Sequence, residues 1–527
     1  MNKLEKYLSS CMTYPHWKKI GIYHHHGFCI PLFSLRSKKS CGIGEFLDIL
    51  PIIDWCQELG MDIIQLLPLN ETGPAFSPYN ALSSCALEPM LLSLHALPHL
   101  EKKIELKKKL HLFSSLNSKK YIDYLYVKKK KLSWLYEYYL SFFDFFRKDE
   151  HFLTFCRQNH WLENYALFHS IKDDLQEDQW QKWPKDLQDL SEKNFSFLLK
   201  KHEKKINFYF LLQYLSFYQM ESVKEYAQKK KVFLKGDIPI LISPSSCDVW
   251  SDRKIFDMSH IAGCPPDDYE PKGQKWGFPL FNWDLLKKRG FDWWKRRLNV
   301  ASSCYHIYRI DHVVGFFRIW AILPSDLPIH GKFLPKDPKK WSIQGKENLE
   351  MMINNSSLLP IAEDLGLIPH CVYSTLNELG ICGTKVMRWQ KNNSNFIALK
   401  DYEPLSMTCV SNHDLEPMRL LWQACPEEAK KLAQEKNWRY QVPLSEEKLK
   451  EILYDSHHTS SLFHINLLQE YLSLFPSLRW DNPKDDRINR PGTIDKRNWT
   501  YRFRPYVEKI ISHNGLKQAI KDIIKKI

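Results

Sequence analysis

Four short apolar segments in the second half of the chain each lead directly into a group of polar or charged residues. The segments are 232–234, 307–308, 358–362 and 407–410, and the groups that follow contain Asp237, Arg309-Ile310-Asp311-His312, Glu363-Asp364 and His413-Asp414. Buried parallel strands are typically short apolar runs of this kind. Since an α/β barrel gathers the carboxyl ends of its strands around one active site, the pattern predicts such a barrel with these polar groups at its mouth.

The residues before position 90 predict the same architecture. Apolar residues recur at helical spacing between Phe46 and Leu59, and Gly60 is a typical helix end. Residues 61–67 then form an apolar run that predicts a buried strand leading into the loop 68–81. A helix followed by a short buried strand is the repeating unit of a parallel sheet.

Residues 92–228 follow a different pattern. This stretch is rich in Lys, Tyr, Phe and Trp and contains few strand signals, which favours helices. We expect it to form one or more helical subdomains inserted on the loops of the barrel, with a separate helical domain as the alternative.

The sequence therefore predicts an α/β fold, a single (β/α)8 TIM barrel over residues 1–527 with inserted, largely helical subdomains. The residues after Asp414 are mainly helical in pattern and contain no run of short strands. No C-terminal β-domain is expected.

Charge and cysteine content restrict the class of protein. The formal net charge is +14, carried by lysine runs at 107–109, 128–131, 200–201 and 229–231. No nucleic-acid recognition motif accompanies them, so we interpret the runs as solvated helix surface and expect no nucleic-acid partner. No apolar run approaches the length of about 18 residues that a membrane span requires. The 13 cysteines show no CxxC pair, which is typical of the reducing cytoplasm.

Aromatic residues make up 14% of the chain and include 18 Trp. Their faces are surfaces on which sugar rings can stack, although most such residues belong to cores. Composition thus permits carbohydrate binding without establishing it. The triple histidine 24–26 is interpreted as a solvated loop without function.

The carboxylates Asp311, Glu363 and Asp414 fit glycosyl transfer with retention. That chemistry requires a carboxylate nucleophile and a second carboxyl group, about 5–5.5 Å away, that serves first as acid and then as base. Arg309 lies two residues before Asp311, on the same face of a strand, where it would keep Asp311 ionised. His312 and His413 offer donors for sugar hydroxyls.

Two other interpretations of these residues remain. A lone Asp after a strand is often a helix N-cap or an ion-pair partner. A metal site could use Asp311, His312, Glu363, His413 and Asp414, but metal sites usually pair ligands at tight local spacing such as HxxxH, and none occurs here. We expect no metal.

Several longer motifs resemble the 4-α-glucanotransferases, also known as amylomaltases or disproportionating enzymes. In chain order they are 42–46 (GIGEF), 77–84 (SPYNALSS), 235–240 (KGDIPI), 263–283 (from GCPPDDY through GQKWGFP to Trp283), 308–318 (from YRIDH to GFFR), 362–366 (AEDLG), 489–493 (NRPGT) and Asn498-Trp499. The resemblance covers nearly all of 28–90 and 230–425, with a weaker match near the end of the chain.

This resemblance implies an activity and residue roles. Asp311 would be the nucleophile that forms a glucosyl-enzyme ester, Glu363 the general acid/base and Asp414 the transition-state stabiliser. Tyr79 would stack on the sugar at the cleavage site, and Asp237, His312 and His413 would contact its hydroxyls. Trp276 or Trp283 would line the neighbouring subsites. The substrates would be α-1,4-glucans and maltooligosaccharides, and no cofactor is implied.

The sequence also departs from the family pattern. Asn412 stands where the family usually has Thr before the His-Asp pair, and Glu416-Pro417 stand where a small hydroxyl residue often follows. The segments 316–320 and 365–369 are closer to the cytosolic plant-type branch. These departures concern the preferred acceptor rather than the chemistry.

Two rival functions share some of these features. A hydrolase of the α-amylase type has the same barrel and three carboxylates, but the 263–283 block and the expected lack of a terminal β-domain favour the transferase. A catalytically inactive glucan-binding protein would be expected to lack one of the three carboxylates, and all three are present. The sequence does not indicate an oligomeric state.

Overall fold

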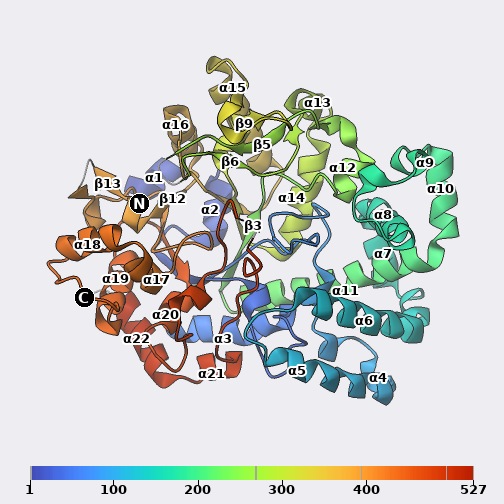
Figure 1. The fold of residues 1–527 in the computed structure, drawn as a ribbon, viewed down its shortest axis with the longest axis horizontal. Helices are drawn as coiled ribbons and strands as arrows, with labels where there is room; N and C mark the ends of the chain where they lie inside the picture. The colour runs from blue at the N-terminus through green and yellow to red at the C-terminus, as the bar shows by residue number, and fades with distance from the viewer. Residues whose placement is uncertain (1–2, 268–269, 393–394, 494, 526–527) are drawn as a thin grey trace.

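A barrel of eight parallel strands lies at the centre of the molecule (Figure 1). The computed structural model describes residues 3–267, 270–392, 395–493 and 495–525. In chain order the barrel strands are β1 (His25–Ile30), β2 (Ile63–Leu66), β3 (Phe233–Ile238), β8 (Ile307–Ile310), β11 (Leu359–Ala362), β12 (Gly383–Val386), β15 (Ser406–Cys409) and β16 (Phe463–Leu467). Neighbouring strands are parallel throughout, so all their carboxyl ends open on one face.

The barrel closes between β11 and β12. The ladder runs β11-β8-β3-β2-β1-β16-β15-β12, and a parallel bridge between Ile361 and Cys382 joins its two ends. The Ala362 N–H donates to the carbonyl of Cys382 at 2.8 Å across this seam. The structure thus confirms the predicted TIM barrel.

Helices precede most of the strands on the outside of the barrel. These are α3 (Ile49–Leu59), α11 (Glu203–Lys229), α14 (Asp292–Cys304), α15 (Lys339–Asn354), α16 (His370–Leu379) and α19 (Glu446–His457). The predicted helix before residue 60 is confirmed as α3, which buries Ile49, Ile53, Cys56 and Leu59 and ends at Gly60 with φ of 79°. Such a left-handed cap suits glycine because it has no Cβ.

The triple histidine is part of the barrel rather than a solvated loop, so that interpretation was wrong. His25 and His26 open β1, and His25 is fully buried with its Nδ1 2.7 Å from Asp62. His26 stacks on His464 of β16. Polar rings paired inside the barrel explain why this strand shows no apolar run.

The region between β2 and β3 is helical wherever it is regular (Figure 1, cyan to green). Its helices are α4 (Ile104–Lys108), α5 (Ser114–Asn117), α6 (Tyr124–Phe146), α7 (Glu150–Gln158), α8 (Trp161–Leu175), α9 (Lys185–Gln188), α10 (Glu192–Lys201) and α11. Aromatic residues pack between α6, α7 and α11, as in the contacts of Tyr214 with Phe146 and Phe152.

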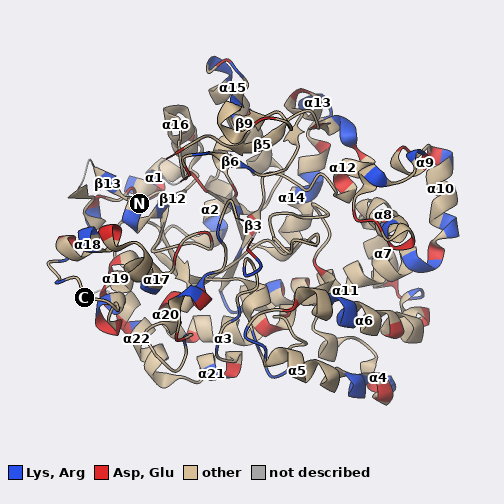
Figure 2. Ribbon diagram, viewed as in Figure 1, with Lys and Arg blue, Asp and Glu red and all other residues tan. Residues whose placement is uncertain are grey.

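Buried ion pairs fasten α6 to the barrel loops. Lys131 is fully buried, 2.6 Å from Glu45, and Lys128 lies 3.5 Å from Glu71. The lysine run 128–131 was expected to be solvated surface, and for these two residues that expectation was wrong, because each neutralises a buried glutamate. The outer helices carry interspersed positive and negative charges (Figure 2).

A second sheet lies over the mouth of the barrel. It contains β5 (Ile261–Cys264), β6 (Gln274–Lys275), β9 (Ile319–Ile322) and β10 (Lys332–Leu334), antiparallel in the order β10-β9-β5-β6. Two ribbons, β4 (Phe256–Asp257) with β7 (Leu280–Phe281) and β13 (Lys391–Asn392) with β14 (Asn395–Phe396), are shorter. The sequence predicted helical inserts and not this sheet, which joins the loops after β3 and β8.

The remaining helices lie at the edges of the barrel: α1 (Lys3–Leu8), α2 (Tyr14–Ile20), α12 (Cys247–Ser251), α13 (Trp283–Lys288), α17 (Met418–Ala424), α18 (Pro426–Glu435), α20 (Leu468–Leu472), α21 (Val507–Ile511) and α22 (Asn514–Ile524). Within the described residues after Asp414, the barrel strand β16 is the only strand, so no β-domain follows there. None of the described helices combines the length and the apolar character needed to cross a bilayer.

Candidate active site

The guanidinium of Arg309, on β8, lies among three carboxylates at the barrel mouth. Its Nη1 is 2.7 Å from Asp237 Oδ2 and 3.0 Å from Asp311 Oδ1, and its Nη2 is 2.7 Å from Glu363 Oε1. Only 6% of the arginine side chain is exposed. Because β3, β8 and β11 are neighbours in the barrel, residues that are far apart in sequence converge on one cation.

Asp311 and Glu363 differ in their surroundings. Asp311 directly follows β8 and accepts from the Ile240 N–H at 3.2 Å. Burial raises the pKa of Asp311 well above its usual range, against the opposing effect of Arg309. Glu363 directly follows β11; burial acts to raise its pKa too, but Arg309 and the His312 N–H outweigh it and lower that pKa. The pKa values of the two carboxyl groups are therefore shifted in opposite directions in the unliganded site.

The directions of these two pKa shifts are the reverse of the sequence expectation. Arg309 was expected to keep Asp311 ionised, and a carboxyl acid at Glu363 needs a raised pKa. In the unliganded site burial outweighs Arg309 at Asp311, whereas at Glu363 the Arg309 contact at 2.7 Å and the His312 N–H at 2.8 Å outweigh burial.

Asp414 lies in the loop after β15 and is held on both oxygens. Asn489 Nδ2 donates to its Oδ1 at 2.6 Å, and His413 Nε2 lies 3.3 Å from its Oδ2. Its own N–H donates to Asn412 Oδ1 at 3.0 Å. Burial acts to raise the pKa of Asp414, but His413 and Asn489 outweigh it and bring that pKa to about 2. The group is therefore a carboxylate at neutral pH.

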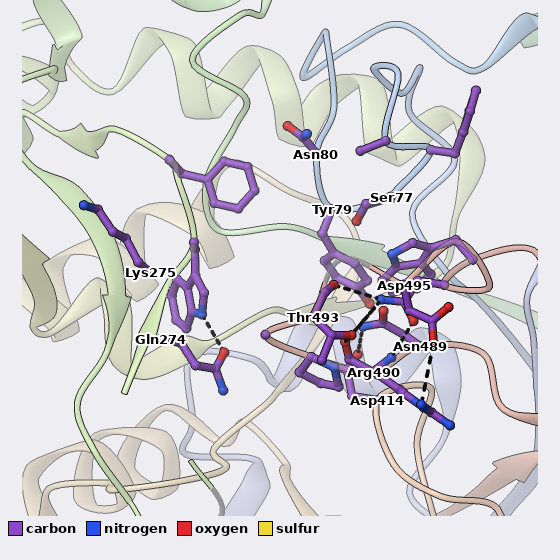
Figure 3. Close-up of a pocket in the computed structure, with 18 of the residues that line it drawn as sticks. Ser77, Tyr79, Asn80, Gln274, Lys275, Asp414, Asn489, Arg490, Thr493 and Asp495 are labelled. Carbon is purple, nitrogen blue, oxygen red and sulfur yellow. Dashed lines mark hydrogen bonds and ion pairs between the residues drawn. The ribbon is translucent and has the colours of Figure 1, made fainter. Parts of the chain in front are cut away.

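Tyr79 links the loop after β2 to this cluster. Its hydroxyl donates to Asp237 Oδ2 at 2.7 Å, and its ring stacks on His413 with centroids 5.1 Å apart. Trp499 packs against both rings. Figure 3 shows Tyr79 reaching from its loop toward Asp414 and Asn489, with Gln274 and Lys275 on the opposite wall.

These residues open into a cleft of about 1710 Å³, more than a compact small-molecule pocket needs. Tyr79, Trp276, Asp311, His312, Glu363 and Asp414 line it. Phe76, Tyr124 and Leu125 form an apolar part of the wall, and Asn489–Thr493 with Trp499 form another. A cleft of this size can hold an extended ligand across the carboxylates.

The other sequence-predicted residues lie behind this wall. Asp237, Arg309 and His413 are buried. Tyr79 and Arg309 both donate to Asp237, and His413 lies beside Asp414. Trp283 packs against Phe281, Trp294 and Phe316 instead of lining the cleft. The expected hydroxyl contacts of Asp237 and His413 and the expected subsite at Trp283 are therefore not found at the cleft surface.

His312 joins the carboxylate pair to the aromatic wall. Its backbone is in the left-handed region with φ of 44°, which is uncommon for a residue with a side chain. Its ring contacts Trp276 edge-on at 4.9 Å. Burial lowers the pKa of His312 to about 4, so the ring is neutral at pH 7.

Sequence reasoning assigned no role to Asn489 and Trp499, although both belong to the closing motifs. No apolar strand precedes them, and Asn489 is 75 residues from Asp414 in the chain. The motif itself was the signal that could have identified them. Of the 263–283 block, Asp268 and Tyr269 lie outside the described residues.

Within the ranges that the structure describes, no group of three or more His, Cys, Asp or Glu side chains is placed to hold a metal ion. Carboxylates around a buried arginine, at the strand ends of a (β/α)8 barrel and open to a long cleft, define a barrel enzyme that acts on glycosidic bonds.

The family model for 4-α-glucanotransferase matches residues 30–508, so the chain belongs to the 4-α-glucanotransferase family. The 4-α-glucanotransferase of Chlamydia caviae is 46% identical over 97% of this chain and 96% of its own, and that of Chlamydia pneumoniae is 44% identical over 99% of both. The amylomaltase of Streptococcus agalactiae, solved in complex with acarbose, superposes with a TM-score of 0.80 at 25% identity, covering 95% of this chain and 98% of its own.

Proposed function

We propose that this enzyme moves a segment of an α-1,4-glucan to the 4-hydroxyl of an acceptor glucan or glucose, with retention, through a glucosyl ester on Asp311. The observation that carries the proposal is that Asp311 and Glu363 contact neighbouring nitrogens of one guanidinium on the cleft floor. Carboxyl groups tied to one small cation suit the short spacing of retaining enzymes better than the spacing of about 6.5–9.5 Å in inverting ones.

The reaction has two balanced steps. In the first, an oxygen of Asp311 bonds to the anomeric carbon, the glycosidic C–O bond breaks, and Glu363 gives its proton to the departing oxygen. In the second, Glu363 takes the proton of the acceptor 4-hydroxyl, the acceptor oxygen bonds to the same carbon, and the ester breaks. Two displacements at one carbon retain its configuration.

Substrate binding would supply the protonation states that the reaction requires, against the directions in which the unliganded site shifts the two pKa values. A glycosidic oxygen beside Glu363 accepts a hydrogen bond only from the neutral acid, so it favours protonated Glu363. Positive charge developing at the anomeric carbon favours the anionic form of Asp311. The proton of the pair then belongs to Glu363 when the reaction starts.

The surrounding residues support this chemistry. Asp414, ionised and held by Asn489 and His413, would stabilise the flattened, positively charged sugar. Tyr79 would stack on the sugar at the cleavage site, and His312 and Trp276 would contact adjacent rings. Asp237, Arg309 and His413 act from behind by fixing Tyr79 and the carboxylates. The acarbose complex of the streptococcal relative supports a glucan ligand here.

We also propose that the whole chain works as one catalytic barrel unit, with 92–228 as a helical insertion within it. The buried pairs Lys131–Glu45 and Lys128–Glu71 support this division. Ile122, Asp123, Tyr124 and Leu125 of the insertion line the cleft itself.

Mass spectrometry tests the ester on Asp311. A Glu363→Gln variant given a donor with an activated leaving group should complete the first step and stall before the second. After rapid acid quench, we expect one glycosyl unit added to the peptide that contains Asp311. An unmodified Asp311 peptide, or an adduct elsewhere, would contradict the proposal.

A further inference from the structure

Glu416, one of the departures from the family pattern, bridges two arginines beside Asp414. Its Oε1 lies 2.5 Å from Arg487 Nη1, and its Oε2 lies 3.3 Å from Arg388 Nη2. All three side chains are largely buried, with 19% of Glu416, 17% of Arg487 and 6% of Arg388 exposed. A glutamate between two buried cations offsets their mutual repulsion.

Arg487 in turn connects Asp414 to the segment that holds it. Its Nε donates to the Asn489 carbonyl at 2.9 Å, and its Nη2 lies 3.5 Å from the Asp414 carbonyl, at the outer limit of a hydrogen bond. The Asn489 side chain donates back to Asp414 Oδ1 at 2.6 Å. The contacts of Arg487, Asn489 and Asp414 form a closed ring that fixes the carboxylate relative to the wall formed by residues 489–493. Figure 3 shows Asn489 beside Asp414 in this wall.

We propose that Glu416 is a positioning residue that orients the Asp414 carboxylate through Arg487 and Asn489. The proposal rests on the role proposed above for Asp414. Glu416 touches none of the reacting atoms; it aims the Arg487 guanidinium, which holds the backbone of Asn489 so that the amide meets Asp414. Without Glu416, Arg487 loses its carboxylate partner while Arg388 keeps Glu428, 3.7 Å from its Nε, and the 487–489 segment shifts away from the Asp414 carboxylate.

A misplaced Asp414 affects the transition state more than the ground state. Its charge stabilises the positive sugar that exists only as the bond breaks, and a displacement of about 1 Å can cost roughly 10²-fold in rate. Glu416 is not among the residues that line the cleft. Loss of Glu416 should therefore lower kcat while KM changes little.

The experiment compares Glu416→Ala and Glu416→Gln in steady-state transfer from maltotriose. We expect kcat to fall on the order of 10- to 100-fold in the Ala variant, with KM within about threefold. The Gln variant keeps the shape and one carbonyl acceptor, so it should retain more activity than Ala. If Ala fails to fold, the Gln variant carries the same comparison of kcat and KM. An unchanged kcat in folded Glu416→Ala, or in Gln alone where Ala does not fold, would overturn the proposal.

A matched control separates positioning from general stability. Arg419 and Asp486 join α17 to the same 480–489 segment by a buried ion pair, 3.4 Å apart, without touching Asp414. Asp486→Asn should lower the melting temperature and leave kcat within about twofold. A fall in kcat equal to that of the Glu416 variant would mean that any damage to this segment suffices, and would overturn the specific role of Glu416.

A double-mutant cycle tests the route through Asn489. If Glu416 acts through that amide, Glu416→Gln combined with Asn489→Ala should be no slower than Asn489→Ala alone. Fully additive losses would rule this route out. Asp414→Asn distinguishes this proposal from the proposed function. An active Asp414→Asn variant would contradict the role of Asp414 itself. An inactive Asp414→Asn variant together with a normal Glu416→Ala variant would contradict only the positioning role of Glu416.

Discussion

Glu363 accepts a hydrogen bond from the backbone N–H of His312 at 2.8 Å. His312 directly follows Asp311, so this bond ties the end of β11 to the residue after the proposed nucleophile. The left-handed backbone of His312 aims its N–H at the neighbouring strand. The spacing of Asp311 and Glu363 is therefore set by backbone, independently of their shared contact with Arg309.

Asp311→Asn should abolish transfer, with a fall in kcat on the order of 10⁴ or more, because an amide cannot form the glycosyl ester. The measurement is the initial rate of maltotriose conversion, with thermal unfolding as the control for folding. Activity within tenfold of the wild type in the folded variant would exclude Asp311 as the nucleophile.

Glu363→Gln should affect donors according to their leaving groups. A donor whose leaving group needs no proton should form the ester at a near-normal rate, and turnover should then stop at the second step, which needs a base. Pre-steady-state release of the leaving group gives the first rate, and steady-state product gives the second. Equal losses on activated and ordinary donors would argue against an acid/base role.

The sequence predicted β3, β8, β11 and β15 because each is an apolar run that stops at a polar group. Their carboxylates could be identified for the same reason. It did not predict β16, because the buried His464 and Asn466 of that strand interrupt the apolar run. A search for apolar runs misses a strand whose polar residues find their hydrogen-bond partners inside the barrel.

Two other features, the position of Trp283 and the pKa shifts of the carboxylate pair, could not be predicted from a local sequence pattern. Trp276 and Trp283 are equivalent aromatic residues on one stretch of sequence, but pairing of β7 with β4 turns the second onto Trp294 and away from the cleft. The opposite pKa shifts of Asp311 and Glu363 follow from burial and from the contacts of Glu363 with Arg309 and the His312 N–H. Both depend on contacts between segments that are distant in the chain.

Lys131→Met should destabilise the fold strongly. The lysine is fully buried and pairs with Glu45, whose pKa burial raises to about 7, so its removal leaves a buried carboxyl group without its partner, at a cost of about 3–5 kcal/mol. Urea unfolding at pH 7 measures the change. Lys129→Met, an exposed neighbour in the same run, is the matched control and should change the free energy of unfolding by less than about 0.5 kcal/mol. Equal effects would contradict the buried pair.

Stability should fall on acidification through three clustered histidines, the buried His457 and His464 and the half-buried His26. His26 Nδ1 lies 2.8 Å from His457 Nδ1, and His26 stacks on His464. Burial lowers the pKa of His26 to about 4 and holds those of His457 and His464 well below their usual value. The unfolded chain therefore binds more protons than the native one, and this contribution is complete above about pH 6.5 and is lost as pH falls toward 4.

Each such histidine adds about 1.4 kcal/mol per pH unit to the slope in that window. Urea unfolding between pH 7 and pH 4.5 should show the loss, and His457→Gln should flatten the curve. His111→Gln, at an exposed position, should leave the slope unchanged. A slope in His457→Gln identical to that of the wild type would show that His457 does not contribute.

The last prediction is that transfer exceeds hydrolysis and that Trp276 is needed for the excess. Both outcomes begin from the same ester and differ only in the attacking hydroxyl. Water is abundant, so an acceptor sugar prevails only if the cleft orients its 4-hydroxyl, and such orientation can be worth an effective molarity of about 10⁵ M or more. Trp276 and Phe278 line the cleft on the side of His312, whereas Trp283 does not line it.

Maltotriose should therefore yield glucose together with oligomers longer than itself, while the total of reducing ends stays nearly constant, because each transfer makes one bond for each bond broken. In Trp276→Ala, reducing ends should rise faster relative to glucose release, since a loosely held acceptor competes less well with water. Trp283→Ala is the matched control, because it removes an aromatic side chain that does not line the cleft. The ratio of reducing ends to released glucose should stay unchanged in the folded fraction of that variant. Reducing ends that climb steadily in the wild type, with no product longer than maltotriose, would make the enzyme a hydrolase; an unchanged ratio in Trp276→Ala would assign acceptor binding to another part of the cleft.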